Sequence, residues 1–281
     1  MYVLPYGQMS LWGLFEPQIY DFNLILDLSL SITPIYFDIN PKVSKLKGIY
    51  RIGPHNKDVL SIIFGGLLGD AHAEKRLNGV SACSAAETAL FTEDMHAEHR
   101  SEGNKQEKEG LGTRIIFYQR AIHIEYLLHL HKILSTLGYC NTKIPIITTR
   151  LGSKGKLLKI IRFSTWTYTS FNWIHKSWYD KNIKRLPECL DQYLSPLALA
   201  IWIMDDGAKF GNSLKFCTNS FTFDECIRII YILKEKFDIK ASIQSAGKKD
   251  QYLVYILKES MDNLRNIVSP YIIPEMKYKL N

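Results

Sequence analysis

Two short apolar runs that each end in an acidic residue dominate the hydrophobic pattern of this chain. The first run covers residues 62–71 and includes Asp70, and the second covers residues 199–207 and includes Asp206; a small residue follows each acid. If each run forms a helix, its acid lies at the negative end of the helix dipole, where a carboxylate is disfavoured. The pattern therefore predicts a positive group, such as a metal ion, beside each acid.

Each run is followed by the same series of predicted elements, namely a strand, a helix and a hairpin, and then a further helix. After the first run these elements are predicted at 114–119, at 124–134, at 144–149 with 159–165, and through 171–179. After the second run they are predicted at 213–219, at 224–233 and at 241–244 with 252–256, before a short terminal helix. Thr222 is a suitable N-cap for the helix at 224–233.

The two series align as copies of one unit. Residues 217–219 lie 100 positions after residues 117–119, and the same offset places Glu225 on Glu125. The path from acid to strand is longer in the first copy by about the length of residues 77–112, a polar, acidic stretch that we interpret as an insertion. The predicted organisation is an N-terminal extension at 1–54, a first repeat at 55–187 that contains the insertion, and a second repeat at 188–281.

The charge of the chain points to a polyanionic partner. Lys and Arg number 35 against 28 Asp and Glu, and the formal net charge is +7. Residues 1–40 and 77–112 are acidic, so the rest of the chain is more basic than this total. A basic surface favours phosphates, although a merely solvated lysine-rich surface would give the same count. The five cysteines form no CxxC pair, and the most apolar stretch, 22–37, contains Asp27. Neither a zinc site, nor a disulfide framework, nor a membrane span is therefore expected.

A shared acidic site follows from the duplication. Two helices packed side by side would bring Asp70 and Asp206 together, and Gly65 and Gly69 would allow a close approach. Converging carboxylates repel unless a cation bridges them, and hard divalent ions such as Mg²⁺ prefer carboxylate oxygens. Metals held in this way are common in nucleases. The alternative is that both helices only pack in the core and that the acids are surface residues.

The hairpins and strands carry basic residues that suit DNA. A β-ribbon fits the major groove, where lysines hold phosphates and arginines read guanine. For any single residue, a solvated surface charge is the alternative. The predicted DNA-binding residues are Arg114, Arg150, Lys154, Lys156, Lys159 and Arg162 in the first repeat, and Lys209, Lys215, Lys240, Lys248 and Lys249 in the second.

Residues 64–71 and 199–207 resemble the paired signatures of single-chain LAGLIDADG homing endonucleases. The resemblance implies an α+β fold in which two pseudo-symmetric αββαββα halves form a DNA-binding saddle with the signature helices at the central interface. It implies that Asp70 and Asp206 are catalytic metal ligands, that Ala71 and Asp205 belong to the same metal site, and that Mg²⁺ is the cofactor, with Mn²⁺ able to replace it.

Further site residues follow from the same resemblance. Lys184 and Lys279 match basic residues that approach the active site in relatives, and Gln119 and Asn219 match polar residues near the scissile phosphates. Asp205 stands where relatives have a small residue, so we expect it to pack or to hydrogen-bond. Ile201 is also bulkier than the residue usual in relatives, which predicts an asymmetric helix seam.

The expected activity is cleavage of both strands of a long DNA site, by a monomer without a membrane association. The alternative is an RNA maturase that assists splicing of its host intron, alone or as a second activity. Residues 2–13 resemble a segment of mitochondrial cytochrome b. This second resemblance implies an intron-encoded protein that is read from an upstream exon and made in the mitochondrion.

Overall fold

The computed structural model describes residues 48–51, 53–76, 112–152 and 155–281. The chain divides into a unit Met1–Phe37 and a unit Asp38–Asn281, and every described residue belongs to the second unit. The cytochrome b-like segment, nearly all of the predicted insertion, and Lys154 lie outside the described residues. Ahead of the first helix, Arg51 donates from Nη1 to the carbonyl of Thr167 (2.9 Å), which ties this segment to the first repeat.

The first repeat contains two long helices and a four-stranded sheet. Its α-helices are α2 (Lys57–Leu68), α4 (Ile124–Thr136) and α5 (Asn172–Trp178). Its strands are β1 (His72–Arg76), β2 (Gly112–Arg120), β3 (Thr148–Leu151), β4 (Leu157–Ser164), β5 (Tyr179–Asp180) and β6 (Ile183–Lys184). Short 3-10 turns occupy Gly48–Tyr50, Ala121–His123 and Thr169–Phe171.

The second repeat contains the corresponding elements. Its α-helices are α6 (Leu190–Tyr193), α7 (Pro196–Asp206), α8 (Phe223–Phe237) and α9 (Met261–Val268). Its strands are β7 (Gly207–Phe210), β8 (Ser213–Cys217), β9 (Ala241–Ser245) and β10 (Tyr252–Ile256). The 3-10 turns are Lys258–Ser260, Ser269–Tyr271 and η8 (Pro274–Lys279). Within the described residues, no helix is both long and apolar enough to cross a membrane.

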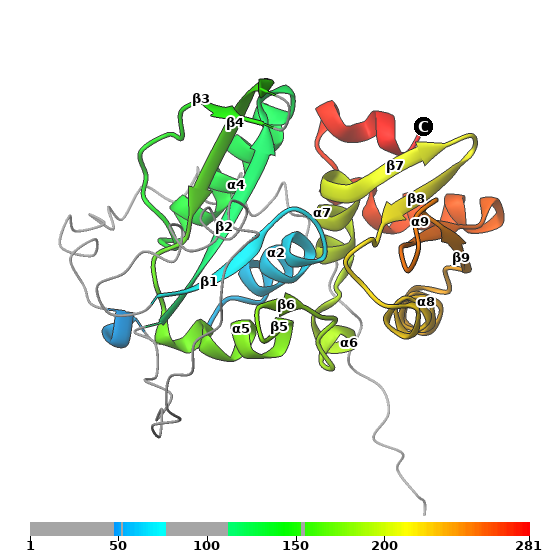
Figure 1. Cartoon of the computed structure of the whole chain (residues 1–281), viewed down its shortest axis with the longest axis horizontal. Helices are drawn as coiled ribbons and strands as arrows, with labels where there is room; N and C mark the ends of the chain where they lie inside the picture. The colour runs from blue at the N-terminus through cyan, green and yellow to red at the C-terminus, as the bar shows by residue number, and fades with distance from the viewer. Residues whose placement is uncertain (1–47, 52, 77–111, 153–154) are drawn as a thin grey trace, which may run out of the picture. The chain divides into compact units, whose positions relative to one another are not determined.

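The two four-stranded sheets have the same topology, and β5 pairs with β6 in a separate two-stranded sheet. The first has the order β1-β2-β4-β3 and the second β7-β8-β10-β9, and all pairs are antiparallel (Figure 1). Each half therefore follows the predicted series αββαββα, and the predicted α+β class is confirmed. The hydrophobic pattern alone missed β1 and β7, because both are short edge strands whose residues do not alternate between apolar and polar.

The first hairpin begins later than the pattern predicted. The expected strand at 144–149 starts only at Thr148, which pairs with Ile160. Ile144 and Ile146 are 68% and 71% exposed, and Pro145 between them lacks a backbone N–H to join a ladder. The predicted hairpin at 241–244 and 252–256 is confirmed, as is the N-cap at Thr222, whose hydroxyl accepts from the backbone N–H of Glu225 (3.3 Å).

The offset between the two repeats is 99, not the predicted 100. His72 pairs with Ile116 in the first sheet, and Ala208 pairs with Lys215 in the second. If Asp70 corresponds to Asp206, His72 corresponds to Ala208 and Ile116 to Lys215. Burial agrees with this offset: it matches buried Leu127 with buried Cys226, whereas the expected partner Ile227 is 48% exposed. A shift of one residue moves a strand residue to the other face.

Helices α2 and α7 lie against each other along an asymmetric seam, as predicted. A Cβ on Gly65 would lie 2.4 Å from the carbonyl oxygen of Ala198 and 2.9 Å from the Cβ of Ile201. A Cβ on Gly69 would lie 2.5 Å from the Cβ of Asp205. Gly65 and Ile201 are equivalent positions of the two repeats, and so are Gly69 and Asp205. The seam thus follows the pseudo-two-fold axis and places a glycine opposite a larger residue at both points.

One face of each sheet is covered by helices. In the first repeat, Phe117 of β2 stacks on Phe163 of β4 (centroids 5.0 Å apart), and His131 of α4 meets the edge of Phe163 (5.2 Å). In the second repeat, Trp202 of α7 stacks on Phe216 of β8 (3.8 Å). Side chains of the opposite register parity lie on the other face of each sheet, which no described helix covers and which we call the uncovered face.

Candidate active site

The ends of α2 and α7 bring the two predicted acids together. Asp70 is exposed in the turn that follows α2, and Asp206 is the half-buried last residue of α7. Burial raises the pKa of Asp206 to about 7, and the charge of Asp70 adds to this rise, whereas Lys184 and Lys279 oppose it. The negative charges of the two carboxylates therefore repel one another, and together they favour a cation between them.

Gln119 connects one of these acids to a third carboxylate. Its Nε2 donates to Oδ2 of Asp70 (2.8 Å) and to Oδ1 of Asp205 (3.0 Å). Burial and the charge of Asp70 hold the pKa of Asp205 well above its usual range, and a hydrogen bond with Tyr126 opposes them. Asp205 both packs against Gly69 and hydrogen-bonds, which are the two supporting roles expected for it.

Tyr126 is a site residue that the sequence did not reveal. Its hydroxyl donates to the carbonyl of Ile201 (3.4 Å) as well as contacting Asp205, and the side chain is fully buried. Its position on an apolar face of a predicted helix is typical of a core residue, so spacing alone gave no sign of this contact.

Two lysines supply the positive charge that the helix ends require. Lys184 donates from Nζ to the carbonyl of Gly69 (3.1 Å). Lys279 donates to the carbonyls of Ile203 (3.2 Å), Met204 and Asp205 (3.0 Å). Since Gly69 and Asp205 are equivalent positions, the lysines make matching contacts in the two halves. Such contacts satisfy free carbonyls at a helix C-terminus and offset its dipole.

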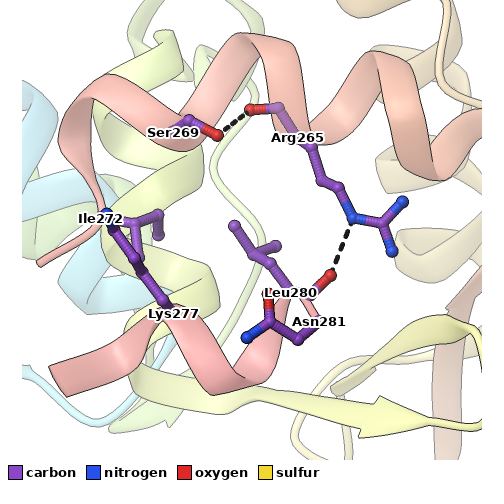
Figure 2. Close-up of a pocket in the computed structure, with 6 residues that line it drawn as sticks. All are labelled: Arg265, Ser269, Ile272, Lys277, Leu280 and Asn281. Atoms are coloured by element: carbon purple, nitrogen blue, oxygen red, sulfur yellow. Dashed lines mark hydrogen bonds between the residues drawn. The ribbon is translucent and has the colours of Figure 1, made fainter. Parts of the chain in front are cut away.

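The chain end that carries Lys279 is fastened to α9. In the pocket that Figure 2 shows, Nε of Arg265 donates to the carbonyl of Leu280 (2.8 Å). The hydroxyl of Ser269 donates to the carbonyl of Arg265 (2.5 Å) at the end of the same helix. This pocket lies beside the residue that follows Lys279, so its contacts fix the backbone from which the lysine reaches α7.

The second repeat has no counterpart of Gln119 at the expected place. With the offset of 99, Gln119 corresponds to Thr218, whose hydroxyl donates to the carbonyl of Tyr252 (2.8 Å) and accepts from Sγ of Cys226 (3.5 Å). Asn219, the predicted counterpart, lies exposed in the turn after β8. The predicted equivalence of Asn219 and Gln119 is therefore wrong by one residue, and the two halves of the site differ.

The site suits a divalent ion that takes some of its ligands from the protein and the others from a substrate. Within the described part of the chain, no group of three or more His, Cys, Asp or Glu residues could hold a metal. Asp70 and Asp206 offer two carboxylates, and Ala71 can add only its backbone carbonyl. Mg²⁺ is commonly held by one or two carboxylates together with substrate phosphates. The donor set therefore suits an ion that is completed by substrate phosphates better than an ion that is enclosed by protein ligands alone.

The predicted DNA-binding residues of the first sheet do not share one face. Arg162 pairs with Tyr118 and Arg150 pairs with Leu158, which places both arginines on the uncovered face. Arg114 also lies on this face, but Glu74 holds its guanidinium (2.6 Å). Lys159 has the register parity of Phe163 and so lies on the opposite face. Lys156 is exposed in the turn.

The second sheet is also divided. Lys215 lies on the uncovered face, with its Nζ 4.8 Å from the ring centroid of Phe210. Lys209 pairs with Leu214, whose side chain faces the helices, so it has the opposite parity. Lys240 precedes β9 and forms an ion pair with Glu259 (2.9 Å). The remaining predicted residues, Lys248 and Lys249, are exposed in the turn between β9 and β10.

Arg120 is a further basic residue on the uncovered face that was not among the predicted DNA-binding residues. It is the last residue of β2, follows Gln119, and is exposed on the uncovered face. The signal that could have identified it is the alternation along β2, where Arg114, Tyr118 and Arg120 share one parity.

The comparisons with known proteins identify the family of this chain. The family described as "LAGLIDADG DNA endonuclease family" matches residues 95–264. The chain is 48% identical over 237 residues to the cytochrome b mRNA maturase bI2 of Saccharomyces cerevisiae, a match that covers 82% of this chain and 49% of that protein. It is 46% identical over 227 residues to the protein of the same name from Debaryomyces hansenii, which covers 81% and 75% of the two chains. The chain thus spans about half the length of the first relative and three quarters of the second.

A solved structure shares the fold. The homing endonuclease I-WcaI bound to its DNA recognition sequence has a TM-score of 0.61 and 22% sequence identity, and the match covers 91% of this chain and 96% of that one. The likeness extends over both repeats and supports the arrangement of two halves around a pair of packed helices.

Proposed function

Because the chain belongs to the LAGLIDADG DNA endonuclease family, we propose that it is a site-specific endonuclease that cuts both strands of DNA as a monomer. The observation that carries this proposal is that Asp70 and Asp206 meet at the ends of α2 and α7. Their negative charges interact there, and this favours a bound cation. The similar structure whose description names bound DNA supports double-stranded DNA as the partner.

Different residues of the chain would have different roles in phosphodiester hydrolysis. Asp70 and Asp206 would hold a divalent ion, Mg²⁺ or Mn²⁺, which supplies Lewis-acid stabilisation of the charge that develops on the phosphate. Lys184 and Lys279 place positive charge behind the two helix ends, where a phosphate would approach. Gln119 fixes the orientation of the Asp70 carboxylate, and Asp205 in turn fixes Gln119.

Cleavage of a defined substrate tests this proposal. A duplex that spans the intronless cytochrome b exon junction is incubated with the protein, with and without Mg²⁺, and both strands are analysed. We expect cleavage that needs the ion and that Asp70→Asn or Asp206→Asn abolishes, whereas Asp224→Asn, an exposed acid on α8, leaves it intact. Undiminished cleavage by both site variants would exclude the assigned acids.

A second candidate function is assistance in RNA splicing. The relatives that share 48% and 46% identity with this chain are both named cytochrome b mRNA maturases. We propose that the chain also assists splicing of its host intron, and that it acts in the mitochondrion. A splicing assay separates the activities: the Asp70→Asn protein should still promote splicing of the intron while it fails to cut DNA.

A further inference from the structure

The uncovered faces of the two sheets carry different chemistry. On the first sheet, Arg120, Arg150 and Arg162 are all exposed and of one register parity, on strands β2, β3 and β4 (Figure 1). Among the described residues, none of the three forms an ion pair, in contrast to Arg114, which Glu74 holds at 2.6 Å. Three guanidinium groups are thus free to meet a ligand on this sheet.

The corresponding face of the second sheet contains no arginine in any of its described strands. Its side chains include Lys215 and Cys217 on β8, Gln244 on β9, and Leu253 and Tyr255 on β10, which are paired across the strands. Gln244 is exposed, and Tyr255 meets the ring of Phe210 edge-on (6.0 Å). This surface thus presents an amide, a thiol, the Ser242 hydroxyl, aromatic and aliphatic groups, and the amine of Lys215.

The arginines of the second repeat are used elsewhere. Arg228 on α8 donates to the carbonyls of Pro187 and Glu188. Arg265 on α9 donates to the carbonyl of Leu280 (2.8 Å) and to Asp262 (2.8 Å). Both guanidinium groups are therefore hydrogen-bonded within the protein. Neither arginine is available to turn toward the second sheet and supply the arginine that its uncovered face lacks.

Arginine and glutamine read different bases. The guanidinium fork donates two parallel hydrogen bonds to O6 and N7 of guanine, whereas lysine, with a compact charge, mainly holds phosphate. The glutamine amide matches N6 and N7 of adenine, and apolar side chains contact the methyl group of thymine. A surface with three free arginines thus favours G·C pairs, and a surface with glutamine and apolar groups favours A·T pairs.

We propose that the two halves of the DNA target differ in base composition, an inference that rests on the proposed function. The sheet β1–β4 would recognise a half-site with guanines opposite Arg120, Arg150 and Arg162. The sheet β7–β10 would recognise a half-site rich in A·T pairs, with an adenine opposite Gln244 and phosphate contact from Lys215. The target is then a bipartite DNA sequence, guanine-containing on one side and A·T-rich on the other.

Selection from randomised DNA tests this assignment. The full-length protein selects bound or cleaved duplexes from libraries in which each half-site is randomised, and the variants Arg150→Lys, Arg162→Lys and Gln244→Ala are selected in parallel. Arginine-to-lysine changes keep the charge and remove the fork. Each should lower the preference for guanine at one position of one half-site by roughly 5- to 150-fold. Gln244→Ala should lower an adenine preference in the other half-site.

Lys159→Ala is the matched control, because Lys159 is exposed on the same hairpin but has the opposite register parity. It should leave every base preference unchanged. Enriched sequences without guanine in the half-site that the arginine variants affect, or guanine dependence that moves to the Gln244 half-site, would overturn the inference and leave the endonuclease function standing. Failure to enrich any sequence would overturn both.

Discussion

The side-chain amide of Gln119 donates a 2.8 Å hydrogen bond to Asp70, and among the described residues no equivalent amide holds Asp206. At the equivalent position Thr218 is turned toward the carbonyl of Tyr252. The two acids of the site are therefore positioned by different means, although the backbone around them is duplicated.

This difference predicts unequal cleavage of the two strands in the Gln119→Leu variant. Loss of a hydrogen bond to a charged group costs about 1.5–3 kcal/mol, or roughly a 10- to 150-fold lower rate where that acid acts. We expect one strand to be cut slowly and nicked plasmid to accumulate, as measured on a supercoiled substrate and with strand-specific labels. Thr218→Val is the matched control and should not change the ratio of the strand rates. An equal slowing of both strands by Gln119→Leu would contradict the prediction.

The raised pKa of Asp206 predicts that the metal-free protein loses stability as the pH rises. A folded-state pKa of about 7, against 3.8 for the free side chain, means that the folded protein binds the proton more tightly. The free energy of unfolding should therefore fall between about pH 4 and pH 7, by on the order of 4 kcal/mol at full ionisation. Asp206→Asn should remove this contribution and stabilise the metal-free protein at pH 8, as measured by urea unfolding, whereas the raised pKa of Asp205 leaves a dependence of the same sign.

The same carboxylate predicts a pH-dependent response to metal. Mg²⁺ should raise the melting temperature of the native protein at pH 8 more than at pH 5, because protonated carboxylic acids are poor ligands. Asp206→Asn should lack this difference. An equal rise at both pH values, or one that persists in the variant, would show that the ion binds elsewhere.

Much of this fold could be predicted from residue patterns, and the errors have clear physical causes. The apolar runs that contain Asp70 and Asp206 predicted the paired helices, and the repeated series of elements predicted the duplication. The predicted offset of 100 between the repeats was wrong by one residue. It relied on the identical residues Glu125 and Glu225, whereas the strand register depends on which side chains are buried. Only strand pairing reveals that Thr218, not Asn219, corresponds to Gln119.

The site was predicted less completely than the fold. Lys184 and Lys279 were identified through a family resemblance, and the structure places both beside the acids, but Tyr126 has the pattern of an ordinary core residue. The faces of the hairpins were also not predictable from charge: Arg162 and Lys159 are three apart, and the alternation of a strand places them on opposite sides.

The contacts of Lys279 predict a large effect of Lys279→Met on stability. The variant keeps the length of the side chain but leaves the carbonyls of Ile203, Met204 and Asp205 without their donor. We expect a loss of about 2–3 kcal/mol in the free energy of unfolding, measured by chemical denaturation. Lys277→Met, at an exposed position two residues earlier, should change it by less than about 0.5 kcal/mol. Similar losses in the two variants would argue against a specific role of the buried amine.

The seam between α2 and α7 predicts a sharp difference between two adjacent glycines. Gly65→Ala would place a methyl group 2.4 Å from a backbone carbonyl that cannot move alone, so we expect a loss of about 3 kcal/mol or more. Gly66→Ala would meet side-chain atoms of Phe117 and Ala71 at 3.1 and 3.2 Å, and its gain in helix propensity of up to about 1 kcal/mol would offset part of the cost. Thermal unfolding of both variants measures the difference, and equal stabilities would show that the helices separate readily.

The seam also makes the two repeats mutually dependent. Where one helix has Gly65 and Gly69, the other has Ile201 and Asp205, so each point on the axis accommodates one side chain and not two. A homodimer built from two second repeats would force isoleucine against isoleucine and aspartate against aspartate at these two points, whereas glycine would face glycine in one built from two first repeats. The second repeat is therefore shaped to pair with the first repeat and not with a copy of itself.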